Sequence, residues 1–159
     1  MLEMLNRREN YWSVFAHIRV NAVNCVGVAG RGISAQFKSK FPSWFRAYQD
    51  ACTVGEIMPG DIWRYQMPEG QSIWSAATKN DWRFPSEITW VSDCFNNILS
   101  GLLQLRTPRT ITIPALGCGL GGLDWKEVSK LASATLSHQD IQHHRIMVFP
   151  PNFPAGNAL

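Results

Sequence analysis

A glycine-rich stretch near the N-terminus constrains the fold more than any other segment: residues 21–33, with the sequence N-A-V-N-C-V-G-V-A-G-R-G-I. Within six residues it carries three glycines, at Gly27, Gly30 and Gly32. Apolar residues precede it, and Ile33, Phe37 and Phe41 then recur every fourth residue. That spacing is typical of a helix. The stretch therefore predicts a loop that joins a strand to a helix starting near residues 31–34.

A loop of this kind suits an anionic ligand. Glycine allows backbone amides to approach a ligand closely, and the free N–H groups at a helix start attract phosphate. Asn21 and Asn24 can offer amide groups to ribose hydroxyls. Many α/β proteins use glycine here only to turn the chain, and the pattern is neither G-x-G-x-x-G nor the Walker motif. This segment alone leaves a nucleotide site and a structural turn equally open.

Length and composition favour one folded domain spanning residues 1–159. The chain is 45% hydrophobic and 17% charged, which argues against global disorder. The formal charge of +3 permits a polyanionic partner without predicting one. No apolar run reaches the length of a membrane-spanning helix. We expect a soluble, cytoplasmic monomer with no membrane contact.

The four cysteines are far apart in the sequence and contain no C-x-x-C pair: Cys25, Cys52, Cys94 and Cys118. They do not combine with the histidines at any spacing typical of a metal site. We expect free thiols, no metal and no cofactor.

The rest of the chain alternates between strand and helix signals. Strands are expected at 11–20, 61–66, 73–77, 110–113 and 145–149, and helices at about 31–41, 43–52, after Ser86 and from Asp124. Residues 1–9 are expected to be partly helical. Ser86 is expected to cap the helix that follows it. This helix carries the clearest apolar stripe of the chain, which consists of Ile88, Val91, Phe95, Ile98, Leu102 and Leu105. This order predicts an α/β fold in three layers, with a mixed, mostly parallel sheet of about six strands.

Three unusual loops follow the ends of predicted strands. The first is the glycine loop, the second is the polar and aromatic segment 79–85, and the third is a second glycine-rich loop at 117–122. Open sheets of this class bind ligands beyond the carboxyl ends of their strands. We therefore expect the three loops to meet at one site.

Three segments together resemble macrodomains: N-A-V-N-C-V-G-V-A-G-R-G-I (21–33), T-K-N-D-W-R-F-P-S (78–86) and I-P-A-L-G-C-G-L-G-G-L-D-W (113–125). The likeness is greatest to the DarG antitoxin type and the terminal ADP-ribose glycohydrolases. The resemblance implies ADP-ribose as the ligand and ADP-ribosylated DNA or protein as the partner. It places ligand contacts at Asn21, Asn24, Cys25, Val26, Gly27, Gly30, Arg31, Gly32, Ile33, Thr78, Trp82, Pro114, Gly117, Cys118, Gly119, Leu120, Gly121 and Gly122.

The resemblance also assigns the catalytic role to Lys79, because a lysine in the T-K-x-x-W-R segment removes ADP-ribose in DarG-like members. A lysine near the anomeric carbon can protonate the leaving group or form a Schiff base with the opened ribose. Without the resemblance, Lys79 reads as a solvated loop lysine. Trp82 and Phe84 either line the acceptor side, where aromatic rings stack on single-stranded DNA, or pack the loop onto the sheet. Arg83 either contacts a phosphate or pairs with Asp81 or Glu87.

Two departures from the family affect these expectations. Terminal glycohydrolases carry an aspartate in the second glycine loop where this chain has Gly121, a difference that the DarG type shares. The acidic residue that binds adenine in macrodomains has no clear counterpart, and Glu9 is a candidate by distance only. Cys25 and Cys118 read as small packing residues, since no base is adjacent.

Three functions fit this sequence. The first is an ADP-ribosyl hydrolase that removes ADP-ribose from modified DNA, of the thymidine type, or from protein through Lys79. The second is a module that binds ADP-ribose without cleaving it. The third is a phosphatase that acts on ADP-ribose 1″-phosphate with an ordered water.

Overall fold

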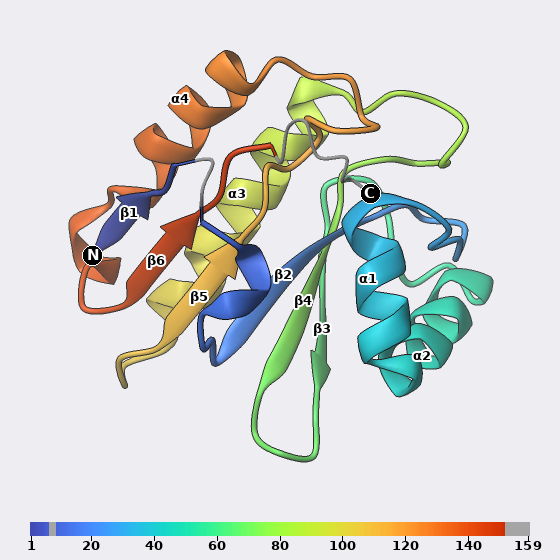
Figure 1. Cartoon of the computed structure of the whole chain (residues 1–159), viewed down its shortest axis with the longest axis horizontal. Helices are drawn as coiled ribbons and strands as arrows, with labels where there is room; N and C mark the ends of the chain where they lie inside the picture. Colours follow the sequence, from blue (N-terminus) through green and yellow to red (C-terminus); the bar gives the residue numbers. More distant parts are fainter. Residues whose placement is uncertain (7–8, 152–159) are drawn as a thin grey trace.

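The computed structural model describes residues 1–6 and 9–151 (Figure 1). Its elements follow in the order β1 (Leu2–Met4), η1 (Tyr11–Ser13), β2 (Ile18–Val23), α1 (Gly32–Lys40), α2 (Pro42–Thr53), β3 (Ile62–Gln66), β4 (Ser72–Ala77), α3 (Ile88–Leu103), β5 (Thr110–Ile113), α4 (Trp125–Leu136), η2 (Gln139–Ile141) and β6 (Arg145–Val148), where η marks a 3-10 helix.

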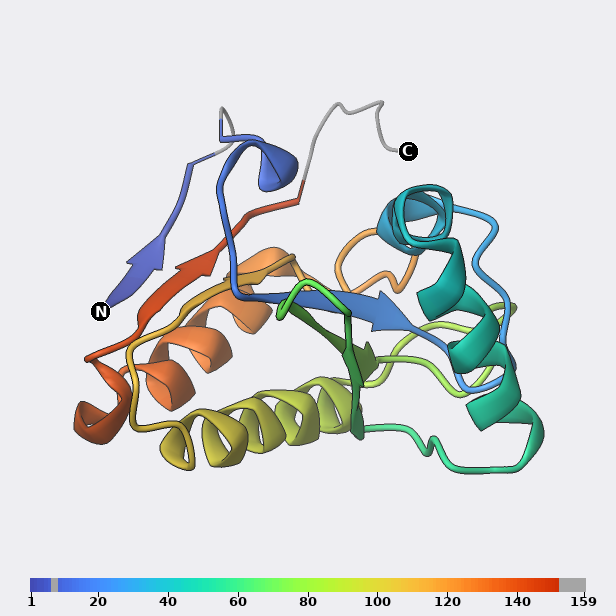
Figure 2. The same ribbon diagram turned by 90° about the horizontal axis from the view of Figure 1, so that it is seen from below.

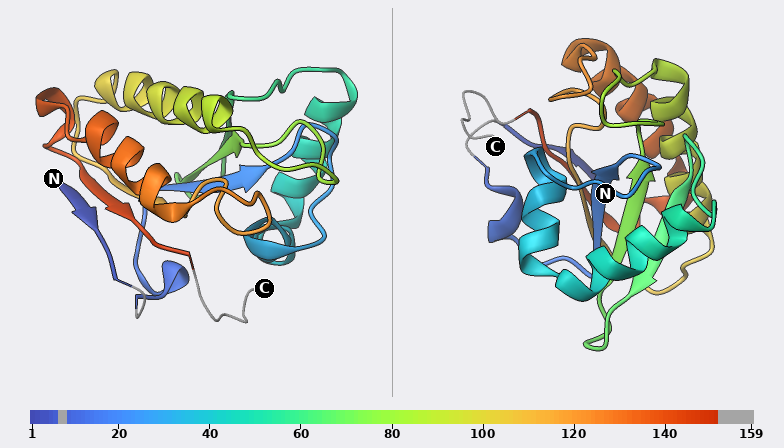
Figure 3. Two further views of the ribbon diagram at one scale, coloured as in Figure 1. Left: turned by 90° about the horizontal axis from the view of Figure 1, so that it is seen from above. Right: turned by 90° about the vertical axis from the view of Figure 1, so that its right-hand side faces the viewer.

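One six-stranded sheet runs through the molecule in the order β1-β6-β5-β2-β4-β3. Neighbouring strands are parallel except β3 and β4, which form an antiparallel pair. Figures 2 and 3 show α3 and α4 on one face of the sheet, and α1 and α2 on the other. This arrangement confirms the predicted three-layer α/β fold with a mixed, mostly parallel sheet.

A hydrophobic core lies on each face of the sheet. The core under α3 and α4 contains the predicted stripe of α3, in which Val91, Phe95, Ile98 and Leu102 are fully buried. The core under α1 and α2 is aromatic and is built around Phe37, Trp44 and Tyr48. The helical periodicity therefore identified the buried face of α3 correctly.

The junction between α1 and α2 has a simple cause. Phe41 ends α1 and precedes Pro42, the first residue of α2. Proline disfavours a helical conformation in the residue before it, and it fits well at the first position of a new helix. The helical conformation is therefore interrupted at Phe41. At its other end, the first turn of α1 follows the loop that leaves β2.

Three local predictions were wrong. Residues 11–20 are not one strand: Tyr11–Ser13 form η1, because the Asn10 side chain caps it at the Trp12 amide. The hydroxyl of Tyr11 donates to the carbonyl of Val20 at 2.6 Å, so this ring packs on the sheet instead of extending it. Leu2–Met4 are not helical, since they pair with β6; residues 7–8 of the expected helix lie outside the described residues.

Ser86 is not the cap of α3. The helix begins after Glu87, whose side chain makes no capping bond, while Ser86 is buried one position earlier. Its backbone amide donates to the carbonyl of Gly121 at 3.0 Å. Burial against the second glycine loop therefore outweighed the capping preference of serine.

Across the described ranges, no helix combines the length and apolar character that crossing a bilayer requires. The single-domain extent of 1–159, the monomeric state and the cytoplasmic location stay predictions.

Candidate functional site

Three loops meet beyond the carboxyl ends of β2, β4 and β5, as expected. We call residues 24–31 the first glycine loop, 78–87 the lysine loop and 114–124 the second glycine loop. The amide of Cys25 donates to the carbonyl of Asn80 at 3.1 Å. The amide of Ser86 donates to the carbonyl of Gly121 at 3.0 Å. The lysine loop is therefore bonded to both glycine loops. Figure 2 and the left panel of Figure 3 show the three segments gathered at this end of the sheet.

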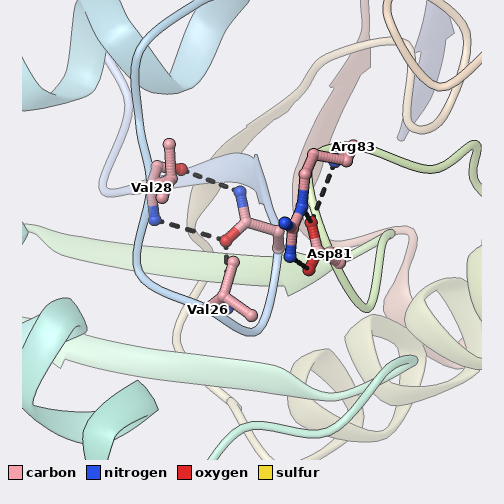
Figure 4. A network of polar contacts seen from close by, with 5 residues as sticks. Val26, Val28, Asp81 and Arg83 are labelled. Carbon is pink, nitrogen blue, oxygen red and sulfur yellow. Dashed lines mark hydrogen bonds and ion pairs between the residues drawn. The ribbon is translucent and has the colours of Figure 1, made fainter.

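The first glycine loop is shaped by the amide of Asn24. Its Oδ1 accepts from the backbone amides of Val26 at 3.0 Å and Val28 at 3.3 Å, and its Nδ2 donates to the Val28 carbonyl at 2.8 Å (Figure 4). The hydroxyl of Tyr48, on α2, donates to the Asn24 carbonyl at 2.7 Å. Asn24 was expected to face a ribose, whereas its amide here builds the loop. Its contact with a ligand stays a prediction.

Glycine is required at one point of this loop and at the first residue of the helix that follows it. Gly27 has φ +81° and packs 3.6 Å from Cys52 and Gln49, measured from where a Cβ would lie. Gly32, the first residue of α1, has φ +61°. L-residues with a side chain rarely adopt these angles. The sequence signal from these glycines therefore has a structural cause.

The first turn of α1 is open to an anion. Arg31 precedes the helix and provides no capping bond, and no acidic side chain lies in the first turn. Gly30 and Arg31 are exposed, while Gly32 and Ile33 are half-buried. Free amides at a helix start, together with the helix dipole, favour a phosphate group. The geometry thus fits the diphosphate role that the sequence predicted here.

Lys79 bridges the two sides of the site. Its Nζ donates to the carbonyl of Leu120 in the second glycine loop at 3.1 Å, and to that of Trp82 in its own loop at 3.4 Å. The side chain is half-buried, and burial lowers the pKa of the Lys79 amine below its ordinary value. This environment differs from that of a freely solvated loop lysine. It suits an amine that gives up or takes up a proton.

Arg83 pairs with Asp81 and not with Glu87. The guanidinium makes two bonds to the carboxylate, Nη2–Oδ2 at 2.6 Å and Nε–Oδ1 at 2.9 Å (Figure 4). These bonds hold the pKa of Asp81 well below its usual range, at about 2. The lysine loop therefore contains a closed ion pair beside an exposed ring, since Trp82 is 52% exposed.

The second glycine loop is packed tightly at Gly117 and Gly121. A Cβ at Gly121 would overlap the hydroxyl of Ser86 and lie 2.5 Å from the carbonyl oxygen of Gly117. Gly117 has φ +76°, and a Cβ there would lie 2.8 Å from Leu123. Gly119 and Gly122 are exposed with open space beside them. The site therefore has no room for an aspartate at position 121 in this loop conformation.

The two cysteines of the glycine loops behave as packing residues. Burial raises the pKa of Cys25 to about 12 and that of Cys118 to about 12. A nucleophilic cysteine needs the opposite shift. Within the part of the chain that the structure describes, no group of three or more His, Cys, Asp or Glu side chains is placed to hold a metal ion.

The remaining predicted residues divide into two groups. One group is buried: Asn21, Thr78 and Pro114. The side-chain amide of Asn21 has no hydrogen-bond partner among the described residues. The other group is exposed around Lys79: Val26, Trp82 and Leu120. Glu9 is exposed in the turn before η1, and its role in adenine binding stays a prediction. A surface cavity of about 560 Å³ lies elsewhere, between the first turns of α3 and α4, and includes none of the predicted residues.

Sequence reasoning missed three parts of the site. Tyr48 was not among the predicted site residues, although its hydroxyl holds Asn24. Ser86 lies under the second glycine loop, and its hydroxyl has no partner among the described residues. The third part is the Leu120 carbonyl, which has no sequence signal because every residue carries one.

Comparison with known proteins gives a consistent result. The family model described as Macro domain matches residues 20–132. The chain is 35% identical over 137 residues to a protein named DNA ADP-ribosyl glycohydrolase from Mycobacterium tuberculosis, covering 84% of this chain and 38% of that protein. A protein of the same name from Thermus aquaticus is 35% identical over 135 residues, covering 83% of this chain and 37% of its own length. The chain thus spans little more than a third of these relatives.

Solved structures agree with the sequence matches. The macrodomain of Mycobacterium tuberculosis DarG superposes with a TM-score of 0.86 at 29% identity, covering 95% of this chain and 98% of that one. The macrodomain of Thermus aquaticus DarG gives 0.84 at 32% identity, with 95% and 99% covered. Thermosipho africanus DarTG, solved in complex with ADP-ribose, gives 0.77 at 27% identity, covering 86% of this chain and 38% of that one.

Proposed function

The chain belongs to the macrodomain family, and on this premise we propose that it removes ADP-ribose from ADP-ribosylated DNA. The observation that carries the proposal is the position of Lys79. Its amine lies between the lysine loop and the second glycine loop, bonded to a carbonyl of each. The names of the relatives, DNA ADP-ribosyl glycohydrolase, support DNA as the acceptor ahead of protein.

The ADP-ribose diphosphate would bind between the start of α1 and the second glycine loop. The uncapped first turn of α1 and the exposed backbone at Gly119 offer donors of the kind that anions prefer. Leu120 lies 3.6 Å from the position of a Cβ on Gly32, so the two parts already face one another. A ligand held there has its distal ribose close to Lys79.

The chemistry follows from the charge that develops as the glycosidic bond breaks. The anomeric carbon becomes positive, and the acceptor leaves with the bonding electron pair. The Lys79 ammonium can give its proton to that acceptor while water adds to the carbon. Alternatively, the neutral amine can displace the acceptor at the anomeric carbon, the acceptor leaving with the bonding electron pair; the resulting glycosylamine opens to a Schiff base, which water hydrolyses to free ADP-ribose. The lowered pKa of Lys79 helps either step.

The surroundings of Lys79 fit a single-stranded DNA acceptor. Five large apolar side chains of the three loops are exposed: Val26, Val28, Trp82, Phe84 and Leu120. Of the cations in the three loops, Arg83 is paired with Asp81, whereas Arg31 and Lys79 make no ion pair with a described residue. Aromatic rings stack on unpaired bases, and cations attract the phosphates. We therefore propose that the strand lies over this exposed rim.

The test measures release of ADP-ribose from an ADP-ribosylated single-stranded oligonucleotide. Because general acid catalysis contributes about 10²–10⁴-fold, Lys79→Ala should lower the rate by at least about a hundredfold. Lys130→Ala removes an exposed lysine of α4 and should leave the rate unchanged. Equal rates for wild type and Lys79→Ala would contradict the lysine mechanism.

Calorimetry with free ADP-ribose separates the alternatives. Binding with no release from DNA, from modified protein or from ADP-ribose 1″-phosphate would show a binding module. Turnover of the 1″-phosphate alone would show a phosphatase. Absence of binding at millimolar concentration would contradict all three functions.

A further inference from the structure

The lysine loop contains a tight turn at residues 81–84 that is held from inside. The Asp81 carboxylate accepts two bonds from the Arg83 guanidinium and a third, at 3.0 Å, from the Arg83 backbone amide. The backbone amide of Phe84 donates to the Asp81 carbonyl at 3.1 Å. Four hydrogen bonds therefore converge on Asp81, and Trp82 is the residue that this turn encloses.

The orientation of the Trp82 carbonyl depends on this turn. A planar peptide bond links that carbonyl to the Arg83 amide, so a restraint on the amide also restrains the oxygen. The oxygen accepts from Lys79 Nζ at 3.4 Å, and the Leu120 carbonyl accepts at 3.1 Å. A continuous chain of contacts thus runs from Asp81 and Arg83 to the amine of Lys79.

We propose that Asp81 and Arg83 are positioning residues that hold the amine of Lys79 at the second glycine loop. This inference rests on the proposed function for its effect on rate. Neither side chain reaches the amine itself. Their role is to fix the Trp82 carbonyl, which in turn limits where Nζ can lie.

The pair is suited to positioning and contributes little to stability. The side chain of Arg83 is 62% exposed and that of Asp81 is 14% exposed. Exposed ion pairs usually contribute little to folding, whereas a small misplacement of a catalytic group can cost about a hundredfold in rate. The two roles therefore predict different outcomes for one substitution.

The chain offers a matched control. Glu3 and Arg145 form a second two-bond ion pair, Nε–Oε2 at 2.7 Å and Nη2–Oε1 at 3.3 Å, where β1 meets β6. Its arginine is also largely exposed, at 56%. Glu3→Gln removes the same charge from the same kind of pair without touching the three loops.

The first measurement does not depend on turnover. The titration of the Lys79 side chain is followed by NMR after isotopic labelling of lysine. In Asp81→Asn the loosened loop should expose the amine, so its pKa should move up toward the ordinary lysine value. Glu3→Gln should leave it unchanged. A Lys79 titration that is the same in wild type and Asp81→Asn would overturn the proposal.

The second measurement is the kinetics of ADP-ribose release. Asp81→Asn should lower kcat about tenfold with KM changed less than about twofold, and should move the Lys79 limb of the pH profile to higher pH. Arg83→Lys, which keeps the charge but cannot form the two-bond fork, should recover only part of the Arg83→Gln loss. A fall in kcat no larger than that of Glu3→Gln would also overturn the proposal. Failure of wild type to release ADP-ribose would instead contradict the proposed function, leaving the NMR result to decide the positioning role.

Discussion

The two ends of the parallel strands are built in opposite ways. At the amino ends of β2, β5 and β6, histidine rings accept hydrogen bonds from backbone amides. His17 Nδ1 accepts from the amide of Thr110 at 2.9 Å, and His144 Nδ1 accepts from the amide of Arg109 at 3.0 Å. His144 Nε2 also contacts the Leu102 carbonyl at 3.0 Å. At the carboxyl ends, the first turn of α1 has no side-chain cap, and the buried hydroxyl of Ser86 has no partner among the described residues.

Large exposed apolar side chains occur at the amino ends too, such as Phe15 just before β2, but they gather in the three loops at the carboxyl ends. Val26, Val28, Trp82, Phe84 and Leu120 are exposed together in the three loops. Burying a polar group without a partner is costly, and exposed apolar side chains that gather in one place mark interaction sites. The difference indicates that the amino ends are used for stability. The carboxyl ends leave hydrogen-bonding groups unpaired and apolar surface exposed, as the proposed ligand site requires.

The largest expected effect tests whether the second glycine loop, at the carboxyl ends of the strands, is rigid. Gly121→Asp places a side chain against Ser86 and the Gly117 carbonyl and buries a charge. We expect it to lower the free energy of unfolding by about 3 kcal/mol, or the Tm by roughly 6–12 °C for a domain of this size. It should also weaken ADP-ribose binding and add no catalytic power.

Gly119→Asp is the control for this prediction. It adds the same charge to the same loop, but the Cβ meets nothing within 4 Å. Its Tm should stay within about 2 °C of wild type, since surface substitutions change stability little. Equal Tm values for the two variants, measured by calorimetry, would show that the second glycine loop adapts freely.

Much of the fold and the position of the loops at the carboxyl ends could be predicted from the sequence, because strong local signals were present. The stripe through Val91, Phe95, Ile98 and Leu102 identified α3, and glycines marked the loops at the carboxyl ends. Gly27, Gly32 and Gly117 do have positive φ angles. Patterns of this kind are local, so one sequence is enough to recognise them.

The errors come from contacts between distant residues. Residues 11–14 were predicted as the start of a strand, but they include the 3-10 helix η1, and the Tyr11 hydroxyl bonds to the carbonyl of Val20. Ser86 has the propensity of a cap, yet burial under Gly121 decides its role. The bond from Lys79 to the Leu120 carbonyl joins residues 41 apart. No single-sequence pattern reports such a contact, so the family resemblance had to supply the lysine.

A smaller effect tests the exposed rim. Trp82→Ala removes the ring but keeps the carbonyl that accepts from Lys79. Because stacking on a base is worth about 1–3 kcal/mol, we expect KM for a modified oligonucleotide to rise about tenfold. Hydrolysis of a modified mononucleotide should be unchanged. Phe15→Ala, at a ring that is 60% exposed outside the three loops, should change neither. An equal loss on both substrates would show that Trp82 shapes the loop instead of contacting DNA.

The smallest effect tests the amino end, through pH. Burial, as the largest cause, lowers the pKa of His144 below its ordinary value of 6.5, and both ring nitrogens are engaged in the neutral form. The unfolded chain therefore binds the proton more readily than the folded one. The stabilisation is fully present above pH 6.5 and is lost as pH falls through the lower, folded-state pKa. Urea unfolding at pH 7.5 and 5.5 should show this loss in wild type and in His143→Gln, whose ring is exposed. His144→Gln should reduce the difference between the two pH values even though it is less stable at both. An unchanged difference in His144→Gln would mean that the amino end does not depend on a neutral imidazole, and the contrast between the two ends would then rest on the loops alone.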